Sequence, residues 1–139
     1  MNQDIVEFLA EGRKLRASQR RGMVLLVEQD PWMRGVVEDW LLQKQCPLIS
    51  CASIEEAEAF LFQEPQFIIL GVSTRIYCRV LQFLKRVDEQ YPSTISVVVS
   101  DCQECLLDLR ERLPRVTIVL KGEGLEDTIK NILPQGRLS

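Results

Sequence analysis

Short runs of apolar residues alternate with amphipathic stretches along most of this chain, and this alternation limits the folds that the chain can adopt. Four of the five apolar runs are almost entirely apolar, as expected of strands that are buried on both faces. The runs cover residues 23–27, 47–51, 67–70, 95–99 and 116–120. Such a pattern predicts a parallel sheet that is covered by helices on both faces.

The stretches between the runs carry signals for the starts and ends of helices. Pro31 stands in a predicted first turn, residues 53–56 form a capping box, and residues 101–104 form an acidic version of that device. Helices should have ended before Pro114 and Pro134. Five strand–helix units predict a flavodoxin-like (βα)5 fold. This is a doubly wound α/β sheet in the strand order 2-1-3-4-5, with its functional crevice at the carboxyl ends of the strands.

Composition and charge narrow the class of protein. The chain has 139 residues, 46% of them hydrophobic, which suffices for one compact domain with its own core. Its net charge of −3 gives no general attraction to nucleic acid or anionic lipid, and no apolar run approaches the roughly 18 residues that span a bilayer. We therefore expect a soluble cytoplasmic protein with neither a membrane nor a nucleic acid as its partner.

Histidine is absent, and cysteine occurs five times at irregular spacing. Without histidine, the chain cannot build a Ser-His-Asp or Cys-His triad, a His-ligated zinc site or a histidine phosphorelay. An odd number of cysteines in a chain that is large enough to fold without crosslinks favours reduced thiols over disulfides. We expect no enzyme activity, no metal and no cofactor.

Several segments follow one another in an order that is typical of one family. Residues 24–34 (VLLVEQDPWMR) place an acidic cluster and an arginine-bearing helix after a buried strand. Residues 51–57, 65–70 and 91–100 continue with a strand–helix junction, a third strand and a fourth strand. In this order, residues 23–133 resemble the receiver domain of bacterial response regulators, the signalling proteins of two-component systems.

The resemblance assigns expected roles to the remaining parts of the chain. It places Ser100 at the hydroxyl position of the family and Lys121 where the family keeps its lysine. Residues 1–22 lie outside the receiver pattern and are expected to form an additional amphipathic helix with a basic linker. Residues 134–139 are expected to form a C-terminal tail.

The resemblance also implies a phosphoacceptor pocket, and this chain departs from the family's pattern there. Gly71 stands at the position of the phosphoacceptor aspartate, and a hydrogen atom can neither accept a phosphoryl group nor hold a metal. The acidic pair that helps to hold Mg²⁺ in receivers reads Glu28-Gln29, with Asp30 one place further on. We interpret the site as a degenerate pocket. It comprises Glu28, Gln29, Asp30, Gly71, Ser100 and Lys121.

These departures predict a pseudo-receiver, a phosphorylation-independent signalling module that acts through protein–protein interaction. Ile118 replaces the family's aromatic switch residue, and Gly122 replaces the proline after its lysine. We expect Lys121 to pair with Glu28 or Asp30 in place of the missing metal and acceptor. Residual phosphorylation of Asp30 or Glu28 is an alternative.

Cys102 and Cys105 form a CxxC motif at a predicted helix start. The helix dipole can lower the pKa of a thiol there, so a redox or metal sensor is the alternative function. The favoured interpretation is structural, because both cysteines recur at helical spacing with Leu106, Leu109 and Leu113. That spacing predicts two buried thiols that act as small hydrophobic side chains.

A protein partner is expected at one of two surfaces, and a homodimer is one form that the interaction can take. Near the amino terminus, Ile5, Phe8 and Leu9 form a stripe that can pack on the domain, support self-association or dock a partner. The second surface combines the helix after the fourth strand, the fifth strand and the last helix, and it includes Arg110 and Lys130. The resemblance favours this second surface, because receivers commonly dimerise or meet partners through it.

Overall fold

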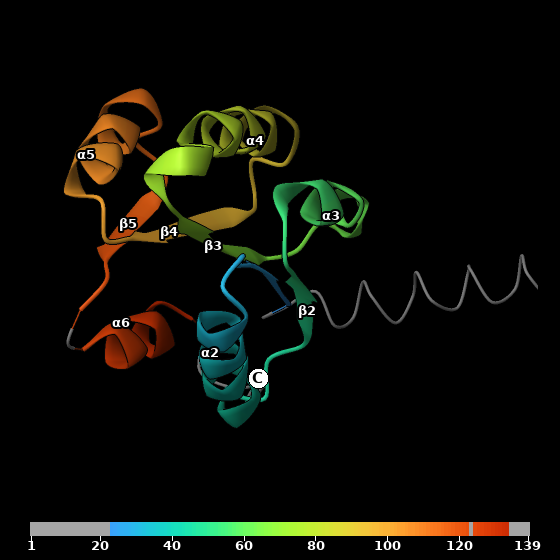
Figure 1. Cartoon of the computed structure of the whole chain (residues 1–139). Helices are drawn as coiled ribbons and strands as arrows, with labels where there is room; N and C mark the ends of the chain where they lie inside the picture. Colours follow the sequence, from blue (N-terminus) through green and yellow to red (C-terminus); the bar gives the residue numbers. More distant parts are fainter. Residues whose placement is uncertain (1–22, 123, 134–139) are drawn as a thin grey trace, which may run out of the picture.

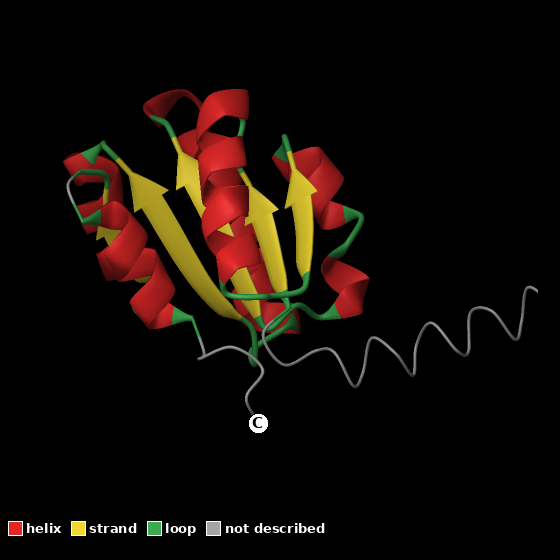
Figure 2. Cartoon of the chain, turned by 90° about the horizontal axis from the view of Figure 1, so that it is seen from below, coloured by secondary structure: helices red, strands yellow, loops and turns green. Residues whose placement is uncertain are grey.

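The computed structural model describes residues 23–122 and 124–133, which form a five-stranded parallel sheet in the order β2-β1-β3-β4-β5. Figure 2 shows the strands side by side with their arrowheads in one direction. The predicted fold class and strand order are therefore confirmed. The strands are β1 (Val24–Val27), β2 (Leu48–Cys51), β3 (Phe67–Val72), β4 (Ile95–Ser100) and β5 (Thr117–Leu120).

Helices cover both faces of the sheet (Figure 1). Helices α2 and α6 lie on one face, and α3, α4 and α5 lie on the other. The helices are α2 (Pro31–Gln43), α3 (Ile54–Glu58), α4 (Tyr77–Gln90), α5 (Gln103–Arg112) and α6 (Leu125–Ile132), with 3₁₀ turns at Leu61–Gln63 and Thr74–Ile76. Within the described ranges, no helix is long and apolar enough to cross a membrane.

A hydrophobic core lies on each face of the sheet because side chains alternate along the strands. Leu25 and Ile68 pack with Phe83 on the face of α3, α4 and α5. Val24 packs with Leu41 on the face of α2 and α6. Strands β1 and β3 are buried along their whole length, since helices cover both faces of these central strands. Burial on both faces explains why the apolar runs in the sequence are nearly uninterrupted.

Local sequence signals determine where two of the helices begin. Pro31 is the first residue of α2, as predicted. The side chain of Ser53 accepts a hydrogen bond from the backbone nitrogen of Glu56 at 3.2 Å. In return, the carboxylate of Glu56 accepts one from the backbone nitrogen of Ala52 at 3.2 Å. The N-cap bond of the predicted capping box is confirmed, whereas the return bond goes to the residue before the N-cap and not to Ser53 itself.

Two boundaries differ from the prediction. Helix α5 is capped by Cys102 rather than by Asp101, because the sulfur of Cys102 accepts a hydrogen bond from the backbone nitrogen of Cys105 at 3.3 Å. Strand β3 does not end before Gly71 but continues to Val72, because both residues pair with β4. Gly71 is thus a buried strand residue. The predicted N-terminal helix and C-terminal tail lie outside the described residues.

Candidate functional site

The carboxyl ends of the strands bring several of the predicted site residues to one edge of the sheet. Glu28 follows β1, Gly71 lies near the end of β3, Ser100 ends β4 and Lys121 follows β5. Because the strands are parallel and neighbours in the sheet, these four residues share the edge where ligands bind in doubly wound folds.

The carboxylate of Glu28 occupies the space where a side chain at position 71 would lie. A Cβ atom on Gly71 would be 2.1 Å from Oε1 of Glu28 and 2.7 Å from its Cδ. Glu28 is only 8% exposed, and its Oε2 accepts a hydrogen bond from the backbone nitrogen of Asp30 at 3.1 Å. The glycine therefore makes room for the glutamate, and any larger residue at position 71 has to displace the carboxylate.

The other polar side chains after β1 do not join Glu28 in the pocket. Gln29 is exposed, and Asp30 caps α2 by accepting a hydrogen bond from the backbone nitrogen of Trp32 at 3.0 Å. Arg34 donates to the backbone oxygen of Glu28 at 2.8 Å and not to its carboxylate. Among the residues that the structure describes, no three Cys, Asp or Glu side chains lie close enough to hold a metal ion.

Ser100 is fully buried and makes two hydrogen bonds across the end of the sheet. Its hydroxyl group donates to the backbone oxygen of Val72 at 2.7 Å and accepts from the backbone nitrogen of Cys102 at 3.0 Å. The hydroxyl thus links the end of β3 to the turn that begins α5. Its single proton is used in this link, so it is not available for an anion in the pocket.

The predicted ion pair of Lys121 is not formed. The ion pairs between described residues include none from Lys121 to Glu28 or Asp30. The physical reason is that Glu28 lies against β3 and Asp30 caps α2, so neither carboxylate is free to approach the lysine. The backbone nitrogen of Lys121 donates to the backbone oxygen of Ser100 at 2.9 Å, and its side chain is half-buried.

Replacing Lys121 with alanine is accordingly expected to change the free energy of unfolding by less than about 0.5 kcal/mol, because no specific contact to the pocket carboxylates is lost. Urea denaturation of both proteins measures this difference. Lys130→Ala is a suitable control, since Lys130 contacts Glu126 at 2.6 Å and Gln43 at 2.8 Å. A loss of more than about 1 kcal/mol for Lys121→Ala alone would show that the lysine does hold the pocket together.

The second predicted partner surface is present as an edge of the molecule, with α5 and α6 on either side of the edge strand β5 (Figure 1). Its elements carry two exposed leucines, Leu107 on α5 at 50% and Leu120 on β5 at 54%, and the exposed Arg110 on α5. Lys130 is half-buried and held by its contacts to Glu126 and Gln43, so it is less available than predicted. The other predicted stripe, Ile5, Phe8 and Leu9, lies outside the described residues.

Ile118, at the predicted switch position, is half-buried on β5. Its side chain packs against the core on the face of α3, α4 and α5. An aliphatic side chain in this position has no aromatic ring that could turn between a buried and an exposed orientation. The residue therefore contributes to packing in the observed structure.

The two cysteines of the CxxC motif differ in their surroundings. Cys105 is buried, which agrees with the predicted apolar stripe of α5. Cys102 is only half-buried and stands outside the helix as its N-cap, so the prediction that both thiols are buried is wrong for this residue. The reason is that the helix begins one residue later than the motif suggested.

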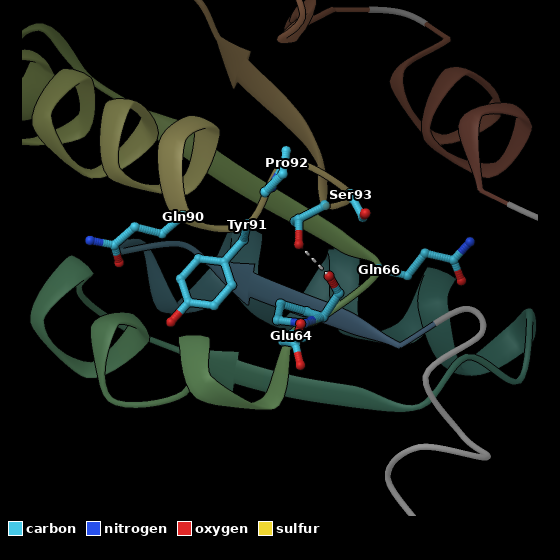
Figure 3. A pocket seen from close by; sticks show the side chains of 8 residues that line it. Glu64, Gln66, Gln90, Tyr91, Pro92 and Ser93 are labelled. Atoms are coloured by element: carbon cyan, nitrogen blue, oxygen red, sulfur yellow. Dashed lines mark hydrogen bonds between the residues drawn. The ribbon is translucent and has the colours of Figure 1, made fainter.

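A cavity of about 340 Å³ lies at the opposite end of the sheet, before the first residues of β3 and β4. Figure 3 shows its lining, which combines polar side chains such as Glu64 and Gln66 with the ring of Tyr91. The hydroxyl group of Thr94 donates to the backbone oxygen of Pro65 at 2.7 Å and joins the two sides. No motif in the sequence indicates this cavity, since loop residues that are distant in the chain form it.

The chain matches no protein-family model and no curated protein sequence. Solved structures, in contrast, match it over most of its length. A crystal structure of a response regulator from Thermotoga maritima has 19% identity, a TM-score of 0.65 and coverage of 81% of this chain and 97% of its own. An orphan response regulator of H. pylori has 21% identity, a TM-score of 0.66 and coverage of 81% and 95%.

A de novo designed protein with a Rossmann 2x3 fold matches equally well, with 14% identity, a TM-score of 0.68 and coverage of 80% of this chain and 88% of its own. The chain has the fold of response-regulator receiver domains, and the resemblance is confirmed at that level. Because a designed protein shares the same architecture, the fold by itself assigns no activity. The function has to be argued from the residues at the edge of the sheet.

Proposed function

We propose that this chain is a receiver-like signalling module that binds another protein without being phosphorylated. The observation that carries the proposal is the position of Glu28, whose carboxylate fills the space above Gly71. In a phosphorylatable receiver, the acceptor side chain would need that space. Here the chain's own glutamate takes it.

The chemistry of phosphoryl transfer supports the same conclusion. Transfer depends on an acceptor oxygen in line with the donor and on a metal ion that neutralises the developing charge. Gly71 supplies no oxygen, and Asp30 is used as a helix cap. The hydroxyl of Ser100 is bound to the backbone of β3. We infer a protein that acts by binding and not as an enzyme.

The edge formed by α5, β5 and α6 is the binding surface that we infer. Its elements carry two exposed leucines, Leu107 and Leu120, and the exposed Arg110. Exposed apolar side chains can mark an interaction site, and arginine is enriched in protein interfaces. Since Ile118 packs against the core and has no aromatic ring to turn, this surface does not depend on a switch at that position. The stripe of Ile5, Phe8 and Leu9 stays a prediction as the alternative binding surface.

Incubation with Mg²⁺ and acetyl phosphate tests the proposal. We expect the intact mass of the protein to stay unchanged, and its elution volume in size-exclusion chromatography to be the same with and without the donor. A receiver domain that has an acceptor aspartate, treated in parallel, serves as the positive control. A gain of one phosphoryl group that maps to Asp30 or Glu28 would contradict the proposal and support the residual-acceptor alternative.

A further inference from the structure

Two thiols lie together in the first turn of α5 and have no part in the proposed function. Cys102 is the N-cap of the helix, and its sulfur is 3.3 Å from the backbone nitrogen of Cys105. This contact places the Cys102 sulfur over the turn that carries the Cys105 side chain. Two residues three apart within a helix have Cβ atoms about 5–6 Å apart, and a disulfide needs about 3.5–4.5 Å. A small change at Cys102, which lies outside the regular helix, can supply the difference.

We propose that Cys102 and Cys105 form a redox-active pair, in which Cys102 attacks a low-molecular-weight disulfide and Cys105 then closes an intramolecular disulfide. The roles follow from accessibility. Cys102 is half-buried and within reach of a small molecule, whereas Cys105 is only 6% exposed and can react only with a group already held at Cys102.

The acidity of the two thiols supports the same assignment. A hydrogen bond from the Cys105 thiol, with further bonds from the Cys105 backbone and the Thr74 hydroxyl, lowers the pKa of Cys102 below its ordinary value. Burial, together with the hydrogen bond to Cys102, raises the pKa of Cys105 to about 11. The thiolate is the attacking species in thiol–disulfide exchange. The thiolate of Cys102 is therefore the nucleophile. The positive end of the α5 dipole also stabilises this negative charge.

The exchange balances in two steps. The Cys102 thiolate bonds to one sulfur of the disulfide RSSR, and the S–S bond of RSSR breaks. The RS⁻ that is released takes up a proton. Cys105 then loses its proton to solvent, and its sulfur bonds to Cys102 while the mixed disulfide breaks and releases a second RS⁻. The protein loses two electrons and two protons, and RSSR becomes two RSH.

The other cysteines do not form such a pair. Cys46 and Cys51 are buried on opposite faces of the sheet, and burial, followed by the charge of Glu56, raises the pKa of Cys51 to about 11. Cys78 is exposed on α4 and serves as an internal control for simple accessibility. The proposed pair adjoins the candidate site, since the backbone nitrogen of Cys102 donates to the hydroxyl of Ser100.

The test equilibrates the reduced full-length protein with mixtures of reduced and oxidised glutathione, followed by acid quenching, unfolding and alkylation. We expect the number of alkylated thiols to fall from five to three as the mixture becomes more oxidising, since two of the five cysteines are consumed. Peptide mapping should assign the new disulfide to Cys102 and Cys105. Cys105→Ser should instead accumulate one glutathione on Cys102, because the resolving thiol is absent.

Cys78→Ser is the matched control and should show the same loss of two thiols as the wild-type protein. The proposal is overturned if all five thiols of the wild-type protein remain alkylatable in the most oxidising mixture. It is also overturned if glutathione is found on Cys78 and not on Cys102, or if the disulfide joins another pair. Mapping of the wild-type protein decides the matter even if Cys105→Ser does not fold.

Discussion

Gly71→Asp is expected to lower the free energy of unfolding by about 3 kcal/mol, although it restores the residue that a receiver needs. The new Cβ atom would lie 2.1 Å from Oε1 of Glu28, so the glutamate has to move. The new carboxylate would then share a buried site with a second negative charge, and no ion pair between described residues neutralises Glu28. Urea denaturation measures the loss, and the variant should remain unphosphorylated because Glu28 still competes for the space.

Matched variants separate the steric part of this loss from the electrostatic part. Gly71→Ala should cost only about 1 kcal/mol, since the carboxylate of Glu28 is the end of a flexible side chain and can move aside. Asparagine has the shape of aspartate without its charge. The loss of stability in Gly71→Asn should therefore lie between the losses in Gly71→Ala and Gly71→Asp. Combining Gly71→Asp with Glu28→Ala should recover about 1–3 kcal/mol relative to the sum of the single changes.

Gly35→Ala controls for the general effect of adding a methyl group to a glycine. A Cβ at position 35 would meet nothing within 4 Å beyond its neighbouring residues and the backbone of its own helix, and the residue is in the middle of α2. Alanine there should raise the free energy of unfolding by about 0.5–1 kcal/mol, because glycine is the poorer helix former.

If Gly71→Asp proves as stable as the wild-type protein, Glu28 does not occupy the pocket in solution.

Ser100→Ala is expected to cost about 2 kcal/mol, because it removes one buried and one partly buried hydrogen bond at once. The backbone oxygen of Val72 loses its donor and the backbone nitrogen of Cys102 loses its acceptor, both at the end of the sheet. The start of α5 depends on the second of these bonds. Thermal or urea denaturation should therefore show a marked decrease in stability.

Ser50→Ala makes the same chemical change, but we do not expect it to lower the stability of the protein. Within the described part of the chain, the hydroxyl oxygen of Ser50 is buried without a hydrogen-bond partner. Removing a buried and unsatisfied hydroxyl group should leave stability unchanged or raise it slightly. Equal losses for the two serine variants would mean that the bonds of Ser100 contribute nothing specific.

The fold could be predicted from the sequence because its strongest signals are local and repeated. Each strand of the sheet coincides with an apolar run, and the capping box at Ser53 and the proline at Pro31 mark helix starts. The end of β3 was harder to place, because glycine carries no side chain that could show burial. Gly71 continues the strand only because β4 offers it a partner, which is a long-range effect.

The candidate site was less predictable, since it depends on which side chain fills a shared space. The sequence shows that Gly71 lacks a carboxylate but not that Glu28, just after the neighbouring strand β1, supplies one. The capping role of Asp30 can be predicted from the sequence, because an aspartate directly before a proline is a common helix start. The capping role of Cys102 cannot be predicted in this way, because cysteine is not among the usual capping residues.

The carboxylate above Gly71 is attached to the same chain as the pocket that it fills. A short tether of this kind gives the attached group an effective concentration of the order of millimolar or higher. A dissolved phosphate or carboxylate compound must exceed that level, or bind more tightly, before it can displace the side chain of Glu28. Dilution therefore leaves the pocket occupied, and below that anion concentration the occupant of this site is set by the gene and not by the surrounding solution.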